Sequence, residues 1–204
     1  MVKLWWGPGS VAGAAAIVLN ECGVHWEGVR VNMAAGEQRG AAYLEINPKG
    51  RVPALATPGG ILTETGAILE YLAAVYRPAL VPADPLAAAR MREVMYYVAS
   101  TLHVAHAHKY RGSRWADREE SFADMRAKVP ETMTACTAYM EALIEGPLLF
   151  GDEATLADAH FYTASNWLEG DGVDLGAFPK VVAFRAAMAA RPSVALAREM
   201  GVFG

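Results

Sequence analysis

Apolar residues follow two different patterns along the 204-residue chain. Up to about residue 76, short apolar runs alternate with helical stretches, and turns rich in glycine and proline separate them. From residue 86 onward the apolar residues recur only at helical spacing, in long stretches without strand-like runs. A mixed first part followed by a helical second part predicts two domains.

The first part predicts the order strand–helix–strand followed by strand–strand–helix. The strands are expected at Lys3–Trp6, Trp26–Val31, Val52–Thr57 and Ile61–Leu62. The helices are expected from Ser10 to Gly23, over a short segment that ends near Ile46, and over Glu64–Tyr76.

A proline-rich segment separates the two parts. Pro78, Pro82 and Pro85 cannot lie within one continuous helix. We therefore expect a first domain over residues 1–77, a linker over 78–85 and an all-helical domain over 86–204. The helices of the second domain are expected at Leu86–Tyr110, Glu119–Glu145, Thr155–Trp167, Pro179–Ala190 and from Val194.

Composition indicates a folded protein without a polyanionic partner. Hydrophobic residues make up 53% of the chain, the net charge is −4, and Lys and Arg form no long run. Binding to nucleic acid or to an anionic membrane is therefore not expected. The beginning MVKLWW does not resemble a signal peptide, so we expect a cytoplasmic protein. Cys22 and Cys136 are expected to be buried free thiols.

The segment NPKGRVPAL, residues 47–55, has a proline just before a strand. A cis Val52–Pro53 bond would turn the Val52 backbone outward, where it can pair with an extended peptide. The alternative is an ordinary turn with a trans proline.

The segment that begins with Glu64 and Thr65 predicts the start of a helix, where free N–H groups favour a bound carboxylate. Thr65 would hold that carboxylate, and Glu64 would pair with an ammonium group of the same ligand. An amino acid or a γ-glutamyl peptide fits both. The alternative is simple capping of the helix by a threonine. Further along, Thr155 and Asp158 form a capping box, which needs no ligand.

The order and spacing of these motifs resemble the cytosolic glutathione S-transferase superfamily over nearly the whole chain, closest to bacterial beta-like or theta-like members. The similar stretches are the PGS turn, GEQRGAAYLEINPKGRVPAL, LTETGAILEYL, the TLAD box and FPKVVAFRAAMAARPSV. The resemblance implies an α/β thioredoxin-like N-terminal domain and an all-α C-terminal domain. It also implies glutathione as co-substrate, no metal, and a homodimer, with Met91, Tyr96 and Tyr97 as candidate interface residues.

The resemblance also implies a glutathione site. Val52 would supply the backbone pair for the cysteinyl group, and Pro53 would be the cis proline. Glu64 and Thr65 would hold the γ-glutamyl end. The weaker candidates for the glycyl carboxylate are Gln38, Lys49 and Arg51.

The catalytic position departs from the family pattern. By one count the cysteine of the beta class falls on Val11, which offers no side-chain donor. By another count, the Pro-x-Ser register of the serine-using classes puts Ser10 in the catalytic place. A Ser10 hydroxyl would stabilise the glutathione thiolate, because a free thiol near pKa 8.5 is mostly protonated at neutral pH. The alternatives are that Ser10 only caps a helix or that a backbone N–H near Val11 stabilises the thiolate.

Three histidines crowd the first long helix. His103 and His106 share a face, whereas His108 is turned away from His106. By the resemblance, His108-Lys109 matches the His-Lys pair of beta-class enzymes, and His106 is an alternative in register. The other interpretation is a solvated helix face.

The expected function is glutathione transfer to a small hydrophobic electrophile. A glutathione-dependent reductase or peroxidase on the same fold is an alternative, although neither cysteine lies in the first turn. An isomerase is disfavoured, because Ser10 is not part of a serine-rich turn. The third possibility is a protein that binds glutathione or another ligand without catalysis.

Overall fold

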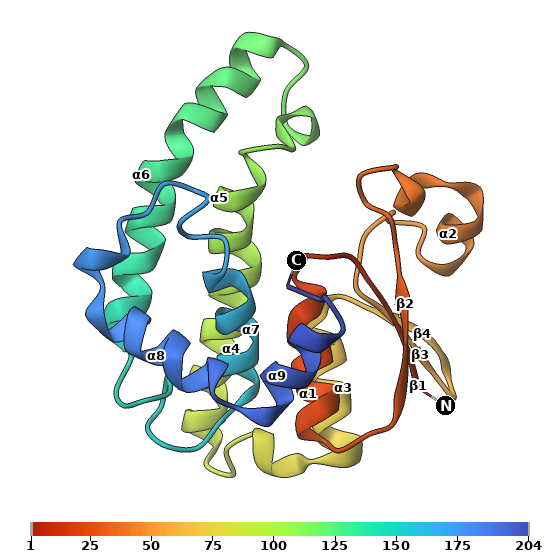
Figure 1. The fold of residues 1–204 in the computed structure, drawn as a ribbon, viewed down its shortest axis with the longest axis vertical. Coiled ribbons are helices and arrows are strands. Elements are labelled where there is room, and N and C mark those ends of the chain that lie inside the picture. The colour runs from red at the N-terminus through yellow and green to blue at the C-terminus, as the bar shows by residue number, and fades with distance from the viewer. Residues whose placement is uncertain (1, 204) are drawn as a thin grey trace.

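The computed structural model describes residues 2–203, with a sheet and its flanking helices followed by a helical part (Figure 1). Within these residues, four strands form one sheet in the order β2-β1-β3-β4. The strands are β1 (Val2–Trp6), β2 (Trp26–Arg30), β3 (Ala54–Thr57) and β4 (Gly60–Thr63). Strand β1 is parallel to β2 and antiparallel to β3, and β3 is antiparallel to β4. This arrangement agrees with the thioredoxin-like topology that the sequence predicts.

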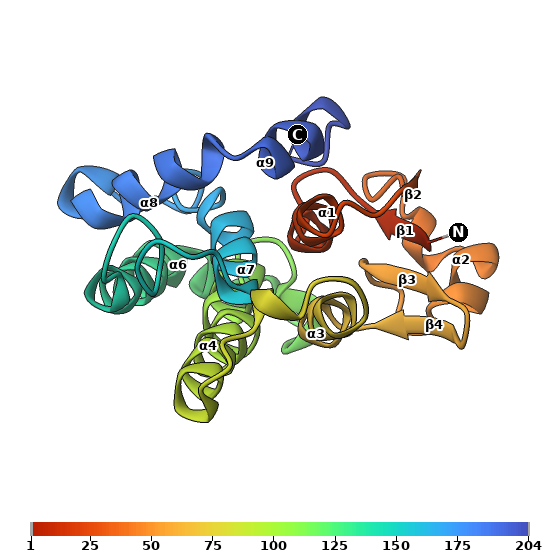
Figure 2. The ribbon, with the colours of Figure 1, turned by 90° about the horizontal axis from the view of Figure 1, so that it is seen from below.

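Two helices separate the sheet from the helical part. These are α1 (Ala12–Glu21) and α3 (Thr65–Tyr76), whereas the short helix α2 (Ala41–Ile46) lies on the other side of the sheet (Figure 2). Residues 12–19 of α1 are all buried, and many of them are alanines. Small side chains let α1 approach its neighbours on both sides closely, so its alanine-rich sequence fits its central position.

The second part contains the expected helices, with one interruption. Its elements are α4 (Pro85–Tyr97), α5 (His103–Ala107), α6 (Glu119–Leu143), α7 (Leu156–Ser165), α8 (Pro179–Ala189) and α9 (Pro192–Glu199). The predicted fold class is confirmed. The expected linker at residues 78–85 runs from just after α3 to the first residue of α4, and as a domain boundary it stays a prediction. No helix in the described part of the chain is long and apolar enough to span a bilayer.

The expected single helix Leu86–Tyr110 is wrong in detail, because a π-helical segment, Val98–Leu102, separates α4 from α5. A π turn inserts one extra residue into the helix, so every later residue is rotated about the helix axis. Within this stretch the Ser100 hydroxyl donates to the Tyr96 carbonyl oxygen at 2.8 Å. The interruption decides which side of α5 faces the sheet-containing part.

Helix α7 is the centre of the molecule. It packs against α1, α3, α4 and α8, and each of its residues from Leu156 to Ser165 is buried. The predicted capping box is confirmed: the Asp158 carboxylate accepts hydrogen bonds from the Thr155 N–H and hydroxyl at 2.8 and 2.7 Å. The Leu149 N–H donates to the same carboxylate at 2.8 Å. The buried carboxylate therefore fixes both the start of α7 and the preceding loop.

The C-terminal segment returns to the first helix. Helix α9 packs against α1, where the Glu21 carboxylate accepts from Arg191 at 2.8 Å and from the Ser193 hydroxyl at 2.6 Å. The Gly9 N–H donates to the Val202 carbonyl oxygen at 2.9 Å, next to the start of α1. The turn before α1 is thereby held by the last residues of the chain.

The prediction that Met91 contributes to a homodimer interface is wrong. Met91 is fully buried within its own chain, so it offers no area to a partner. Tyr96 is 63% exposed and Tyr97 is half-buried, so these two remain available. The homodimer itself stays a prediction.

Replacing Asp158 with alanine should lower the free energy of unfolding by about 3 kcal/mol, because three buried donors lose their acceptor. The matched control is Asp174→Ala. Asp174 also caps a turn, by accepting from the Gly176 N–H at 2.9 Å, but it is exposed, so the loss should stay within about 1 kcal/mol. Urea unfolding of both variants measures the difference, and equal losses would contradict a special role for the buried carboxylate.

Candidate functional site

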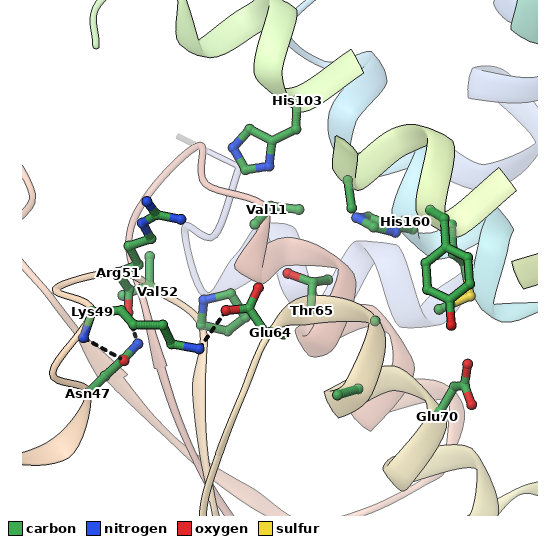
Figure 3. Close-up of a pocket in the computed structure, with 16 residues that line it drawn as sticks. Val11, Asn47, Lys49, Arg51, Val52, Glu64, Thr65, Glu70, His103 and His160 are labelled. Carbon is green, nitrogen blue, oxygen red and sulfur yellow. Dashed lines mark hydrogen bonds and ion pairs between the residues drawn. The ribbon is translucent and has the colours of Figure 1, made fainter. Parts of the chain in front are cut away.

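A cavity of about 510 Å³ lies between the sheet-containing part and the helical part (Figure 3). One wall comes from the loop before β3 and the start of α3. The other comes from α4, the π segment, α5 and α7. Among its lining residues are Val11, Lys49, Arg51, Val52, Pro53, Glu64, Thr65, Glu70, His103 and His160. The cavity therefore brings together Val52, Pro53, Glu64 and Thr65, which the sequence had assigned to one ligand.

The loop before β3 presents an unpaired backbone. The Val52–Pro53 peptide bond is cis, as the family resemblance implied; the motif alone had left a trans proline open. The Tyr43 hydroxyl and the Asn47 amide both donate to the Arg51 carbonyl oxygen, at 2.7 and 2.6 Å, and fix the loop from behind. Within residues 2–203, neither the N–H nor the C=O of Val52 has a hydrogen-bond partner. Both groups are thus available to an extended ligand in the cavity.

The start of α3 combines a helix N-terminus with a carboxylate. Glu64 precedes the helix with a φ of 72°, a conformation that non-glycine residues adopt mainly where the surroundings impose it. Its carboxylate pairs with the Lys49 ammonium at 2.5 Å. The Thr65 side chain follows at the first position of the helix and lines the cavity. This geometry suits a ligand that has a carboxylate and an ammonium group attached to the same carbon atom.

A second cavity of about 630 Å³ adjoins the first, and Val11, Lys49, Arg51, Val52 and His103 line both. It includes the turn before α1 and the predicted candidates Ser10 and Gln38. The Ser10 hydroxyl donates its proton to the Gly7 carbonyl oxygen at 2.7 Å and accepts from the Ala12 N–H at 3.4 Å. The hydroxyl therefore stabilises the turn before α1, and its proton is not free to be donated to a ligand.

Of the three clustered histidines, the structure brings His103 to the cavities and leaves the other two outside. The His106 Nδ1 lies 2.6 Å from the Asp171 carboxylate, and its ring stacks on Trp167. His108 packs edge-on against Trp115. His103 also contacts Trp167, as expected for residues that share a face with His106. Sequence spacing identified the shared face but not which histidine of the pair reaches the site.

His103 is held in a neutral form that can donate one proton. Burial, with help from the nearby Arg111, lowers the pKa of His103 to about 3. Its Nε2 lies 3.5 Å from an Arg111 guanidinium nitrogen, which has no acceptor capacity. We assign Nε2 as the acceptor, so Nδ1 bears the proton and is the nitrogen that can donate to a ligand.

His160 is a second buried imidazole, which the sequence analysis did not single out. It comes from α7, lines the first cavity, and is 1% exposed (Figure 3). Among the described residues neither of its nitrogens has a hydrogen-bond partner. Burial lowers the pKa of His160 to about 4, so the ring is neutral near pH 7. Its position two residues after Asp158 in the capping motif was the only signal in the sequence.

Comparison with known proteins gives a consistent result over both parts of the chain. Residues 1–74 match the family model of the glutathione S-transferase N-terminal domain, and residues 106–196 match that of the C-terminal domain. Glutathione S-transferase GstA of Escherichia coli O157:H7 is 31% identical over 197 residues, which are 95% of each chain. A maleylacetoacetate isomerase of Pseudomonas aeruginosa is 34% identical over 178 residues, covering 84% of this chain and 82% of the relative.

A solved structure is similar over its full length. A glutathione transferase homologue from sulfitobacter, determined with bound glutathione, is 50% identical and superposes with a TM-score of 0.98. The match covers 100% of this chain and 99% of the other.

Replacing His160 with leucine should reduce the loss of stability in acid. The unfolded state binds a proton on this histidine near pH 6.5, but the folded state does so only near pH 4. Between these values the unfolded state binds more protons, so the free energy of unfolding falls as the pH falls, by up to about 3 kcal/mol from this group.

Urea unfolding of both proteins at several pH values between these limits measures the slope. His25→Gln is the control, because His25 is exposed and should leave the slope unchanged. An equally steep fall in His160→Leu would show that the acid sensitivity comes from other groups.

Proposed function

This chain belongs to the cytosolic glutathione S-transferase superfamily, and from that premise we propose that it activates the thiol of glutathione for attack on an electrophile. The observation that supports this most directly is the first cavity. It combines the unpaired Val52 backbone with the start of α3 and the Glu64 carboxylate, which are the groups that a γ-glutamyl peptide requires.

Glutathione would lie across the two cavities. In this proposal the Val52 N–H and C=O pair with its cysteinyl residue, next to the cis Pro53, and the peptide takes the place of an added strand. The α-carboxylate of the γ-glutamyl end is held by Thr65 and the α3 N-terminus, and its ammonium by Glu64. Gln38, Lys49 and Arg51 are available for the glycyl carboxylate, because all three line the second cavity.

The sulfur would then lie near the start of α1, where Val11 lines both cavities. We propose that the thiolate is stabilised by the Val11 N–H, the positive end of α1 and the Nδ1–H of His103. Ser10 is a weaker candidate, because its hydroxyl proton is directed at Gly7. His106 and His108 are also weaker, because they lie outside both cavities.

In the reaction, the thiolate sulfur forms a bond to an electrophilic carbon, and the leaving group departs with its electron pair. The helical side of the second cavity holds the electrophile. Isomerisation is an alternative outcome of such an attack, since the Pseudomonas aeruginosa relative is named as an isomerase. A reductase that uses a protein thiol has less support, because neither Cys22 nor Cys136 lines the two cavities. A cytoplasmic homodimer is the assembly that we propose, by analogy with the family.

Thr65→Val and Glu64→Gln should each raise the Kd for glutathione about tenfold or more, because each removes a hydrogen bond to a charged group. Isothermal titration calorimetry measures the affinities. Glu70→Gln is the matched control: Glu70 lines the same cavity but pairs with Arg92 at 3.0 Å, so the affinity should hardly change. Wild-type affinity in both test variants would contradict the proposed γ-glutamyl site.

His103→Leu should raise the pKa of the bound glutathione thiol by about one unit, which is about 1.4 kcal/mol and a tenfold loss of thiolate well below that pKa. Ser10→Ala should leave the thiol pKa unchanged and should lower only the stability, by about 1 kcal/mol. Thiolate absorbance against pH, at saturating glutathione, measures the difference. A shift in Ser10→Ala with none in His103→Leu would reverse the assignment.

A further inference from the structure

The second cavity is lined by an unusual concentration of positive charge. Five cationic side chains reach it from both parts of the molecule, and its lining contains no acidic residue. These cations are Arg39, Lys49, Arg51, Arg111 and Arg114. The chain as a whole has a net charge of −4, so this cavity differs in sign from the average surface.

The four arginines have no internal counter-ion. Within residues 2–203, none of them forms a salt bridge, whereas Arg77, Arg92, Arg185 and Arg191 are paired with glutamates. Lys49 differs from the four, because Glu64 neutralises it. The cavity thus has four positive charges without an acidic counter-ion in the described residues, and their mutual repulsion favours the binding of an anion there.

The guanidinium groups are close enough to influence one another. Partial desolvation at the cavity wall, and then the charges of Arg51, Arg111 and Arg39, lower the pKa of Arg114 to about 10. Burial and then Arg51 likewise lower the pKa of Arg111. These groups face a common space from opposite walls: Arg39 and Arg51 belong to the sheet-containing part, and Arg111 and Arg114 to the helical part.

The turn that bears Arg111 and Arg114 is firmly held. The Arg114 N–H donates to the Arg111 carbonyl oxygen at 3.0 Å. Gly112 between them is buried against Phe122, where a Cβ atom would lie 2.8 Å from the ring. The two guanidinium groups therefore start from a fixed backbone and lose less freedom when they bind a ligand.

Glutathione accounts for only part of this charge. Once its γ-glutamyl carboxylate is placed at Thr65, one carboxylate remains, and Arg51 with Gln38 on the sheet side suffices for it. Arg111 and Arg114 lie across the cavity, with Arg111 next to His103 and therefore next to the proposed position of the sulfur. The charge left over is on the wall that faces the second substrate.

We propose that Arg111 and Arg114, with Arg39 at the rim, bind carboxylate groups of an acidic electrophile, and this inference rests on the proposed glutathione transferase function. A guanidinium fork matches a carboxylate in two parallel hydrogen bonds and orients it as well as attracting it. The substrate class is then a small organic acid with an electrophilic carbon, in place of the hydrophobic electrophile that the sequence suggested. The anion also supplies the counter-charge that the protein lacks.

The test is calorimetry with three unreactive ligands: S-methylglutathione, S-(1,2-dicarboxyethyl)glutathione, and the dimethyl ester of the two carboxyl groups on the sulfur substituent of that conjugate. The diacid and the diester have the same skeleton and differ in charge. For the wild-type protein we expect the diacid to bind about tenfold tighter than the diester. Added salt should reduce this advantage, because the cavity is open to solvent.

Arg111→Gln and Arg114→Gln should each reduce the advantage of the diacid several-fold and leave the Kd for S-methylglutathione nearly unchanged. Arg114 is exposed, so its variant will fold. Arg114→Lys keeps the positive charge but cannot form two parallel hydrogen bonds to a carboxylate. Its advantage for the diacid should therefore lie between those of the wild-type protein and Arg114→Gln. The matched control is Arg90→Gln, because Arg90 is exposed and lies outside both cavities.

Three results would overturn the inference. The first is equal affinity of the wild-type protein for diacid and diester. The second is an unchanged advantage of the diacid in both glutamine variants. The third is an equal loss of affinity for all three ligands, including S-methylglutathione, which would assign the arginines to the glycyl carboxylate of glutathione. If S-methylglutathione does not bind the wild-type protein at all, the proposed function fails and the inference fails with it.

Discussion

The complete burial of α7 is the constraint on which the rest of the structure depends. A helix that is buried on every side needs partners for its N-terminal N–H groups from within the protein. The reciprocal capping box of Thr155 and Asp158 supplies two of them, and the Asp158 carboxylate also accepts from the Leu149 N–H of the preceding loop. Because α7 packs against α1 and α3 as well as α4, it joins the sheet-containing part to the helical part. The junction is also where the site lies. His160 reaches the first cavity from α7, and Trp167, just beyond its end, donates to the Gly9 carbonyl oxygen at 2.8 Å and contacts the ring of His103.

Much of the fold, and the side of the site that the sheet-containing part forms, could be predicted from the sequence, because they depend on local rules. Glycine and proline residues, the spacing of apolar residues and the TLAD capping box determine where helices and strands begin and end. Val52, Pro53, Glu64 and Thr65 lie in two short segments whose geometry follows from a loop before a strand and from a helix start. The helical side of the site could not be predicted in the same way. The π segment Val98–Leu102 rotates everything after it, so spacing alone does not reveal that His103 reaches the cavities and His106 turns to Asp171.

Other features that the sequence analysis missed depend on contacts between segments that are far apart in the sequence. The sequence placed Met91 at a dimer interface, but the packing of α4 against other helices of its own chain buries it completely. The arginine cluster is the clearest example, because its members are up to 75 positions apart, from Arg39 to Arg114, in a chain with net negative charge. Composition averages over such a cluster and therefore conceals it.

Because Val11 has no side-chain donor, the arginine cluster also affects how well the protein can stabilise a thiolate. A backbone N–H and one neutral imidazole are modest stabilisers of a thiolate, and Val11 adds nothing to them. Unpaired guanidinium charges around the same space favour any anion there, and a glutathione thiolate is one. Binding an acidic substrate would neutralise part of that charge at the moment when the sulfur must attack. Thiol activation and substrate recognition would then depend on the same positive charges. A substrate carboxylate bound by Arg111 and Arg114 would neutralise part of that charge, so substrate binding would reduce the stabilisation of the thiolate. A protein with this arrangement gains selectivity for acidic electrophiles at some expense in the reactivity of its thiolate, because the two anions compete for the same field.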